Sequence, residues 1–228
     1  MPLSPQLVIF DCDGVLVDSE IIACRVMSRE LAALGLTLTP EQCLVEFTGI
    51  TTAAVLARIE TMLGRPLPED FQQTLQQKDF EAFETELQPV AGVKAMLPML
   101  TIPRCIASSG TITKMRLTLG TTGLLSFFEP HLFSAQMVQH GKPAPDLFLY
   151  AAKRMGAEPR RCVVVEDSTA GVHGGLAAGM RVLGFAGGTH ANAEYEAILR
   201  QSGAETVFRN MSELPGLLDG QGASRDAL

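Results

Sequence analysis

Two carboxylates directly follow a short apolar run near the start of the chain. Asp11 and Asp13 come after Leu7–Phe10, and Gly14 comes next. Such a run is typical of a buried parallel strand, although its length alone does not distinguish a strand from a buried helix segment. Strand residues two apart point to the same side, and ligands of open parallel sheets bind beyond the carboxyl ends of the strands. The pattern predicts two carboxylates at one site. Taken alone, it also fits an acidic turn with Gly14 in the turn position.

Polar residues follow the later apolar runs as well. They are Ser108 after residues 104–107, Lys142 in a loop after residues 131–133, and Glu166 and Asp167 after residues 162–165. Two or three carboxylates can hold Mg²⁺, which favours phosphate oxygens as further ligands. A lysine and a hydroxyl would complete a phosphate clamp, and a carboxylate can serve as the nucleophile of phosphoryl transfer. We therefore interpret these residues as one site, since a helix cap or a solvated lysine explains each alone but not their common placement.

The stretch between Ser19 and Gln88 has helical spacing and no convincing strand. Start signals divide it into four helices, which are expected at residues 20–34, from Thr39-Pro40, from Thr51 or Thr52 to 63, and from 68 to about 87. Asp18 and Ser19 are candidate caps of the first helix. A helical run this long is not a single βα crossover. We predict an inserted all-α cap domain over residues 18–88.

After Pro89 the pattern returns to alternating strands and helices. Strands are expected at residues 104–107, 131–133, 162–165 and 181–185, with helices at 93–100, up to 119 and at 146–155, and a loose tail at 220–228. Together with the first strand, these elements predict an α/β fold with a doubly wound, Rossmann-like parallel sheet. Its core domain would comprise residues 1–17 and 89–228.

Composition excludes several classes of protein. In 228 residues, a hydrophobic fraction of 46% and a charged fraction of 19% indicate a globular chain with a substantial core and no membrane span. No basic segment precedes the first apolar run, so we expect no secretory signal, and five scattered cysteines favour reduced thiols in the cytoplasm. The net charge of −7 disfavours a nucleic-acid partner. A phosphate would therefore be held by local cations.

The polar residues at the strand ends resemble the four motifs of the haloacid dehalogenase superfamily. The matching segments are Asp11-Cys12-Asp13-Gly14-Val15-Leu16, Ser108, Gly141-Lys142-Pro143 and Val165-Glu166-Asp167-Ser168. Their order, their spacing and the helical insertion resemble the β-phosphoglucomutase-like branch of sugar-phosphate phosphatases, over nearly the whole chain. Two further segments are similar to 6-phosphogluconate phosphatases, namely Asp18-Ser19-Glu20 and Ser108-Ser109-Gly110 followed by Lys114-Met115.

The resemblance implies a Mg²⁺-dependent phosphatase of a small phosphorylated sugar or sugar acid. It implies that Asp11 attacks phosphorus to form an aspartyl-phosphate, and that Asp13 protonates the leaving oxygen and then activates water. Asp11 should therefore stay ionised, whereas Asp13 should exchange protons near neutral pH. The implied metal ligands are Asp11, the backbone carbonyl of Asp13 and Asp167, with Glu166 as a direct or outer-sphere partner.

The same resemblance implies a phosphate site. Ser108 and Lys142 would contact the transferring phosphoryl group, helped by the amide of Ser109 at a helix start. Glu20 is a candidate substrate contact from the cap, although a carboxylate in the first turn of a helix needs no function. We expect Lys114 on a helix surface. The histidines lack metal-ligand spacing, so we interpret them as structural or exposed.

Other functions compete with the phosphatase. Phosphomutases of this branch carry a histidine and an arginine where Ala23 and Thr52 stand here, which counts against a β-phosphoglucomutase-type mutase. Asp13 argues against a haloacid dehalogenase, which lacks this second aspartate. A receiver-like phospho-aspartate signalling module would be shorter and uncapped, and a noncatalytic metal protein leaves Ser108 and Lys142 without a purpose. The sequence names neither the physiological phosphosugar nor the oligomeric state.

Overall fold

The computed structural model describes residues 4–48 and 52–219 and contains a sheet of six parallel strands. The strands are β1 (Leu7–Phe10), β2 (Arg104–Ser108), β3 (Leu132–Ser134), β4 (Cys162–Glu166), β5 (Arg181–Phe185) and β6 (Thr206–Phe208). Their order is β3-β2-β1-β4-β5-β6, which confirms the predicted doubly wound sheet. The chain switches direction across the sheet between β1 and β4, where Ile9 pairs with Val164. Open α/β sheets form their ligand crevice at such a switch point.

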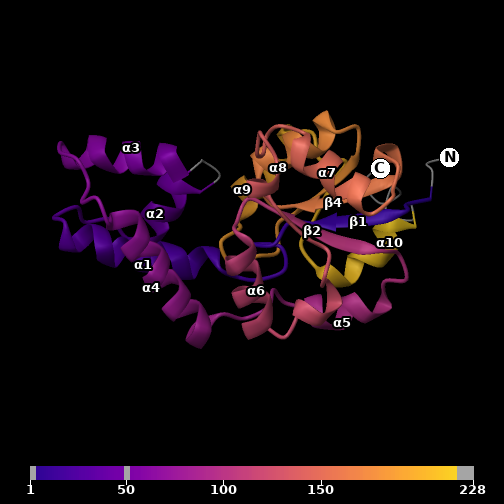
Figure 1. Ribbon diagram of the computed structural model, residues 1–228, viewed down its shortest axis with the longest axis horizontal. Coiled ribbons are helices and arrows are strands. Elements are labelled where there is room, and N and C mark those ends of the chain that lie inside the picture. Colours follow the sequence, from indigo (N-terminus) through magenta and orange to yellow (C-terminus); the bar gives the residue numbers. More distant parts are fainter. Residues whose placement is uncertain (1–3, 49–51, 220–228) are drawn as a thin grey trace.

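Helices cover both faces of this sheet (Figure 1). One face packs against α5 (Val93–Met96), α6 (Ile112–Thr121) and α10 (Leu214–Leu218), and the other against α7 (Asp146–Arg154), α8 (Thr169–Ala177) and α9 (Ala193–Gln201). All residues of β1 are fully buried, because each face of the central strand meets a layer of helices. The end of β1 is therefore held rigidly by the core on both sides.

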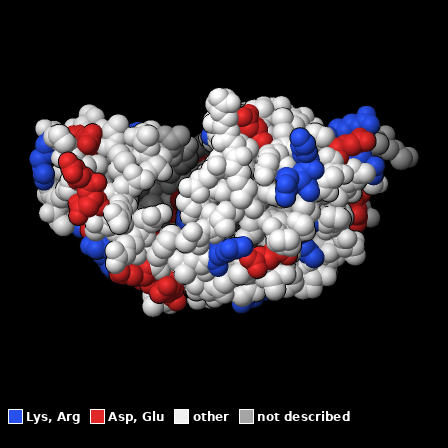
Figure 2. Space-filling model, viewed as in Figure 1, with Lys and Arg blue, Asp and Glu red and all other residues white. Residues whose placement is uncertain are grey.

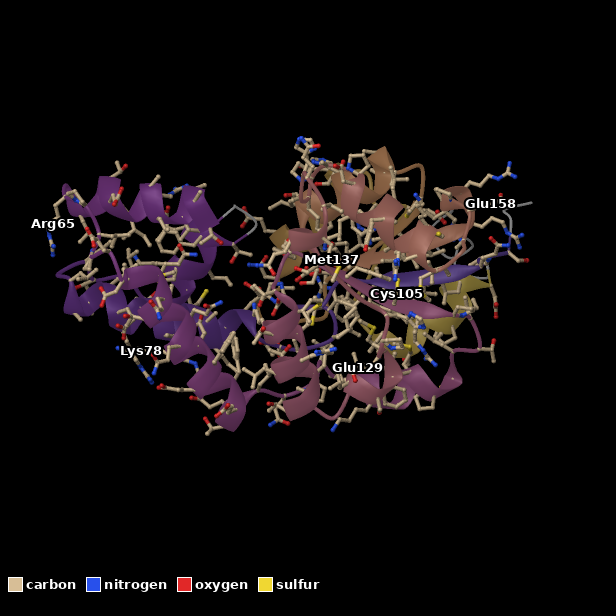
Figure 3. All side chains as sticks on the ribbon, viewed as in Figure 1. Arg65, Lys78, Cys105, Glu129, Met137 and Glu158 are labelled. Carbon is tan, nitrogen blue, oxygen red and sulfur yellow. The ribbon has the colours of Figure 1, made fainter. Side chains whose placement is uncertain are left out.

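In the described part of the chain, four helices outside the sheet build the cap (Figure 1). They are α1 (Glu20–Ala33), α2 (Pro40–Phe47), α3 (Thr52–Leu63) and α4 (Phe71–Glu86). The cap has its own small apolar core, which includes Leu31, Cys43 and Ile59. Figure 3 shows Arg65 and Lys78 on the outside of the cap, while Cys105 lies inside the main core. The expected inserted cap domain is therefore present, and its limits at residues 18 and 88 stay a prediction.

Several local expectations can be compared with the structure. The start signal at Thr39-Pro40 is confirmed, because α2 begins at Pro40 and Thr39 and Gln42 form a capping box there. Sequence analysis missed β6, because three residues at the edge of a sheet give too short a pattern. The helix expected from Pro68 begins only at Phe71. Thr51 and the tail at 220–228 lie outside the described residues. None of the described helices combines the length and apolarity required to span a membrane.

Candidate active site

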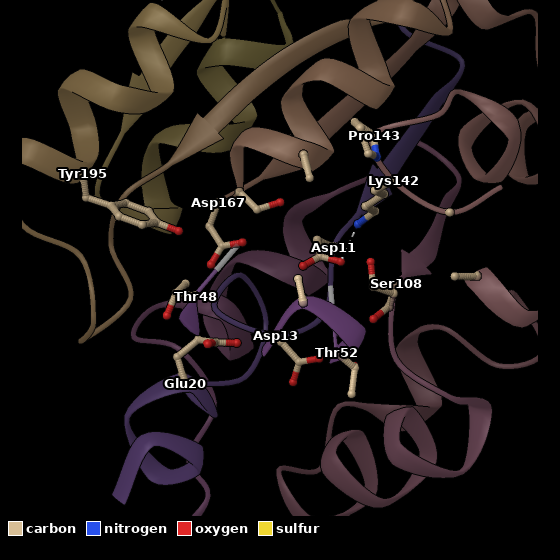
Figure 4. Close-up of a pocket in the computed structure, with 16 residues that line it drawn as sticks. Asp11, Asp13, Glu20, Thr48, Thr52, Ser108, Lys142, Pro143, Asp167 and Tyr195 are labelled. Carbon is tan, nitrogen blue, oxygen red and sulfur yellow. Dashed lines mark hydrogen bonds and ion pairs between the residues drawn. The ribbon is translucent and has the colours of Figure 1, made fainter. Parts of the chain in front are cut away.

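A cavity of about 640 Å³ opens at the carboxyl ends of the central strands. Figure 2 shows the hollow between cap and core from outside, and Figure 4 shows the side chains around it. Its lining includes the predicted residues Asp11, Asp13, Glu20, Ser108, Ser109, Lys142 and Asp167, together with Thr48 and Thr52 of the cap region. The structure thus brings together residues from four strand ends and from the cap.

Lys142 ties the ends of β1 and β4 together. Its Nζ lies 2.7 Å from Asp11 Oδ1 and also forms a short ion pair with Glu166 Oε1. The lysine side chain is only 3% exposed, and that of Glu166 is fully buried. Burial lowers the pKa of Lys142, but Asp11 and Glu166 outweigh it and raise the pKa above its usual value. Lys142 is therefore a charged group inside the site. The alternative, that it is a solvated loop lysine, does not hold.

Three carboxylates at this point could hold a divalent cation. One oxygen atom each of Asp11, Glu166 and Asp167 lies within 4.8 Å of the other two, and all three residues are buried. Burial raises the pKa of Asp11 well above its usual value, with Lys142 opposing the shift and Glu166 and Asp167 adding to it. Burial also raises the pKa of Asp167. This excess of buried negative charge and the oxygen donors fit a hard cation such as Mg²⁺.

Asp13 has different partners from Asp11. Lys114 Nζ lies 2.9 Å from its Oδ1, and the hydroxyl of Ser19 donates a hydrogen bond of 2.6 Å to the same oxygen. Burial raises the pKa of Asp13, but Lys114 and Ser19 outweigh it, so the pKa lies below the usual value. The arrangement stabilises the ionised form of Asp13. The resemblance implies that Asp11 is the carboxylate that stays ionised, yet the pKa of Asp11 is raised when no cation is bound. Burial thus disfavours the ionised form of Asp11, which a bound cation would favour, whereas Lys114 and Ser19 already favour the ionised form of Asp13.

Two sequence interpretations near Asp13 were wrong. Lys114 was expected on a helix surface, yet its side chain is largely buried against Asp13, because α6 packs beside the end of β1 and the cap helix α4. Ser19 was a candidate helix cap, but it forms no capping hydrogen bond at α1 and instead contacts Asp13. Asp18, the other candidate cap, accepts hydrogen bonds from Thr189. Lys114 and Thr189 come from distant elements, so no local signal reveals them as partners, whereas Ser19 lies six residues after Asp13.

Ser108 and Ser109 form the expected polar turn after β2. Ser108 is 1% exposed, and its Oγ accepts a hydrogen bond of 3.0 Å from the amide of Gly110. The cap of the following helix α6 is Thr111, so the alternative explanation of Ser108 as that cap does not hold. The amide of Ser109 was expected at a helix start, but α6 begins only at Ile112. Ser109 is exposed and lines the cavity.

Gly14 allows the chain to turn tightly beside the carboxylates. Its φ of 74° lies in the left-handed region that favours glycine. A Cβ atom at this position would also lie 1.8 Å from Asp167 Oδ2. The glycine expected from the turn pattern is therefore required for a second reason, which is the close approach of the Asp167 carboxylate to the backbone.

A smaller side pocket of about 140 Å³ extends into the cap and shares Glu20 and Thr48 with the main cavity. Asp79 of α4 lines this pocket, and its buried Oδ1 has no hydrogen-bond partner among the described residues. Burial raises the pKa of both Glu20 and Asp79 to about 7. Sequence analysis singled out Glu20 but not Asp79, which sits in a polar helix with nothing distinctive around it.

His190 is a further residue that sequence analysis left without a role. It lies in the loop between β5 and α9, and its Nε2 atom is 3.2 Å from Asp167 Oδ2. Its side chain is 1% exposed. The histidine is thus in contact with a candidate metal ligand, which its position in the sequence did not indicate.

Comparisons with known proteins agree with this geometry. The chain is 32% identical over 218 residues to 6-phosphogluconate phosphatase of Escherichia coli (strain K12), covering 95% of this chain and 96% of that protein. It is 36% identical over 180 residues to hexitol phosphatase A of the same organism, covering 77% of this chain and 80% of that protein.

A solved structure is similar over almost the full length. It is that of a conserved haloacid dehalogenase-like protein of unknown function from Agrobacterium tumefaciens, with a TM-score of 0.86, 40% identity and coverage of 95% of this chain and 98% of that one. The family model for haloacid dehalogenase-like hydrolases matches residues 5–179. This chain therefore belongs to the haloacid dehalogenase-like hydrolases.

Proposed function

We propose that this chain, a sugar-phosphate phosphatase of the haloacid dehalogenase-like family, uses Mg²⁺ and a phosphorylated Asp11 to hydrolyse a small phosphorylated sugar or sugar acid. The observation that carries the proposal is the joint placement of Asp11, Lys142 and the carboxylates of Glu166 and Asp167 at the sheet switch point. The carboxylates suit a cation, and the lysine suits a phosphoryl group. An acidic turn or a structural ion pair would not require all of these groups at one place.

In the first step, an oxygen of Asp11 attacks phosphorus, and the ester bond between phosphorus and the leaving oxygen breaks. Asp13 donates a proton to that oxygen, so the sugar leaves as an alcohol. In the second step, water attacks the aspartyl-phosphate, Asp13 accepts the proton, and Asp11 is restored as inorganic phosphate forms. Ser108 and Lys142 would hold the phosphoryl oxygens through both steps. Bound Mg²⁺, held by Asp11, the carbonyl of Asp13, Asp167 and, directly or through water, Glu166, would supply positive charge against the phosphoryl group.

Asp13 must be protonated in the first step and ionised in the second. Lys114 and Ser19 favour the ionised form, which suits the activation of water. A phosphorylated substrate brings negative charge into the same cavity, and a like charge raises the pKa of a neighbouring carboxyl. Substrate binding therefore favours the protonated form that the first step needs.

The leaving group would occupy the part of the cavity formed by the cap. Glu20, Thr48 and Thr52 offer polar contacts for sugar hydroxyls there. Ala23 lines the adjoining side pocket and has no group that can move a proton, which supports a phosphatase over a mutase. The substrates named for the two similar bacterial enzymes make 6-phosphogluconate and hexitol phosphates the first compounds to test. A cytoplasmic location and the absence of nucleic-acid and membrane partners stay predictions.

The test is a panel of phosphosugars hydrolysed by the purified chain with Mg²⁺. The panel contains 6-phosphogluconate, hexitol phosphates, hexose 1-phosphates and an aryl phosphate, with release of inorganic phosphate as the readout. We expect one class of phosphosugar to exceed the aryl phosphate in kcat/KM by about 100-fold or more, because cap contacts stabilise the cognate transition state. Uniformly low kcat/KM across the sugars would contradict a sugar-phosphate substrate.

The variant Asp11→Asn tests the nucleophile. It should lower turnover of the aryl phosphate by at least about 1,000-fold, because an amide cannot form the acyl-phosphate. Asp146→Asn is the matched control, since Asp146 pairs with His140 at an exposed site outside the cavity. Retained turnover in Asp11→Asn would remove Asp11 as the nucleophile.

A further inference from the structure

We propose that His190 is a positioning residue that holds the Asp167 carboxylate in the orientation required by the divalent cation. The inference rests on the proposed function, because it treats Asp167 as a metal ligand. It adds a residue from a part of the chain, the loop between β5 and α9, that carries none of the motif residues.

The contact itself is buried and isolated. His190 Nε2 lies 3.2 Å from Asp167 Oδ2, with the two side chains 1% and 7% exposed. Among the described residues, neither ring nitrogen forms a hydrogen bond of acceptable geometry, and Asp167 Oδ2 lies within ion-pair distance of Nε2. An unsatisfied polar ring away from water is costly, so the imidazole should be drawn to the nearby Asp167 carboxylate as its hydrogen-bond partner.

Packing fixes the orientation of the imidazole. A Cβ atom on Gly14 would lie 2.9 Å from Cε1 of the ring, and one on Gly188 would lie 2.7 Å from both Cε1 and Nδ1. The ring of Tyr195 meets the imidazole edge to face, with centroids 5.1 Å apart. The ring therefore packs directly against the backbone of Gly14 and Gly188, where a side chain would not fit. This close packing restricts rotation of the ring. A fixed ring can in turn fix the Asp167 carboxylate.

The loop that carries His190 is itself anchored. The neighbouring Thr189 donates hydrogen bonds from its amide and its hydroxyl to Asp18 Oδ1, at 3.0 Å and 2.9 Å. Asp18 belongs to the segment that leads from the core into α1. The imidazole is therefore supported from the side of Asp167 and from the start of the cap, which keeps its Nε2 atom directed at the carboxylate.

Carboxylates that bind metals are commonly oriented by a hydrogen-bond partner, and losing such a partner typically costs about 10- to 100-fold in metal affinity. His190 occupies this position relative to Asp167. With a proton on Nε2, the imidazole would present a donor to Oδ2 across this 3.2 Å contact. The effect of His190 should therefore be seen in metal binding before any substrate is present.

The first experiment is calorimetric titration of MgCl₂ into the metal-free full-length chain. We compare His190→Leu, which fills similar space without a donor, with His190→Gln, which retains an N–H donor. The leucine variant should bind Mg²⁺ about 10-fold or more weakly, and the glutamine variant within about threefold of wild type. His173→Gln is the matched control, because His173 is an exposed histidine on α8, the helix that follows Asp167.

A second measurement follows the wild-type chain, and a variant serves only to assign its signals. With only four histidines in the chain, the ring ¹⁵N signals of His190 can be assigned from their loss in His190→Gln. These signals should shift as Mg²⁺ is added, and the shift should give the same Kd as calorimetry. Addition of K⁺ at the same ionic strength should leave the signals unchanged. Absence of that shift would overturn the inference.

The outcomes separate this inference from the proposed function. Wild-type affinity in His190→Leu, or equal losses in the leucine and glutamine variants, would show that the ring only fills space and would overturn the positioning role. The metal assignment would stand in both cases. If the wild-type chain bound no Mg²⁺, the metal site of the proposed function would fail first, and the role of His190 with it.

Discussion

The end of the sheet and the interior of the cap hold buried acidic side chains in two different ways. At the sheet, Asp11 and Glu166 share Lys142, and Asp13 pairs with Lys114 and Ser19. In the cap, Asp79 has a buried oxygen without a hydrogen-bond partner among the described residues. At the sheet end the carboxylates are therefore paired with cationic side chains. In the side pocket of the cap, one carboxyl oxygen lacks a hydrogen-bond partner among the described residues.

The difference follows from what surrounds each group. Short parallel strands, packed on both faces, fix the residues that follow them, and both lysines reach into the site, Lys142 buried and Lys114 partly buried. The cap has a smaller apolar core, and its ion pairs, such as that of Arg25 with Glu86, lie on its outer surface. We infer that the sheet end supplies the charged groups of the reaction, and that the cap pocket supplies contacts that a ligand can complete.

The largest effect should come from breaking the pairing at the sheet end. Lys142→Met leaves Asp11 and Glu166 without their cation, and we expect kcat/KM for an aryl phosphate at saturating Mg²⁺ to fall by about 100-fold or more, as for loss of one transition-state donor. The affinity for Mg²⁺ should not fall in parallel, since the carboxylates remain. Lys153→Met, an exposed lysine of α7, is the control. An unchanged rate would contradict the phosphate role of Lys142.

A smaller effect is expected at the second ion pair of the sheet end. Lys114→Met removes the cation that stabilises ionised Asp13, so the pKa of Asp13 should rise. The second step needs ionised Asp13, and the limb of kcat that increases with pH should therefore move to higher pH, with a loss of about 10-fold at neutral pH. Kinetics across pH 5 to 9 provide the measurement.

Arg116→Met is the control for Lys114, because Arg116 is exposed on the same helix α6 and pairs with Glu129. The role of Lys114 in setting the ionisation of Asp13 would be refuted by a pH profile identical to wild type.

A smaller effect still, on the stability of the folded chain, is expected at Asp79 in the side pocket of the cap. Burial raises the pKa of Asp79 from 3.8 to about 7, so the folded chain binds this proton more tightly than the unfolded chain. Between these two values the unfolded chain loses the proton first, and stability therefore falls as pH rises through that window. Asp79→Asn removes the effect and should stabilise the chain at pH 8 by about 1–3 kcal/mol, with a much smaller gain at pH 4.

Urea unfolding at pH 4 and pH 8 measures this change, and Glu84→Gln, an exposed carboxyl of the same helix α4, is the control. Equal stabilisation at both pH values would show that the carboxyl is not strained by burial. The comparison between an organised sheet end and an unsatisfied cap pocket would then not hold.

The sequence alone determined the parts that depend on spacing along the chain. Apolar runs and polar residues after them located the ends of β1, β2 and β4, and parallel strands bring such ends to one edge. This spacing is sufficient to predict that Asp11, Ser108 and Asp167 share one site. The helical periodicity of residues 20–87 likewise indicated the cap, because amphipathic spacing is visible within each helix.

Tertiary structure decided the partners of these residues. Lys114 against Asp13, His190 against Asp167 and the unsatisfied Asp79 all depend on how separate elements pack. Their local patterns are those of ordinary helix and loop residues, so the periodicity of the sequence does not reveal these contacts. The physical reason is that charge pairing and burial depend on distance in space, and a contact between distant segments leaves no periodic trace along the chain.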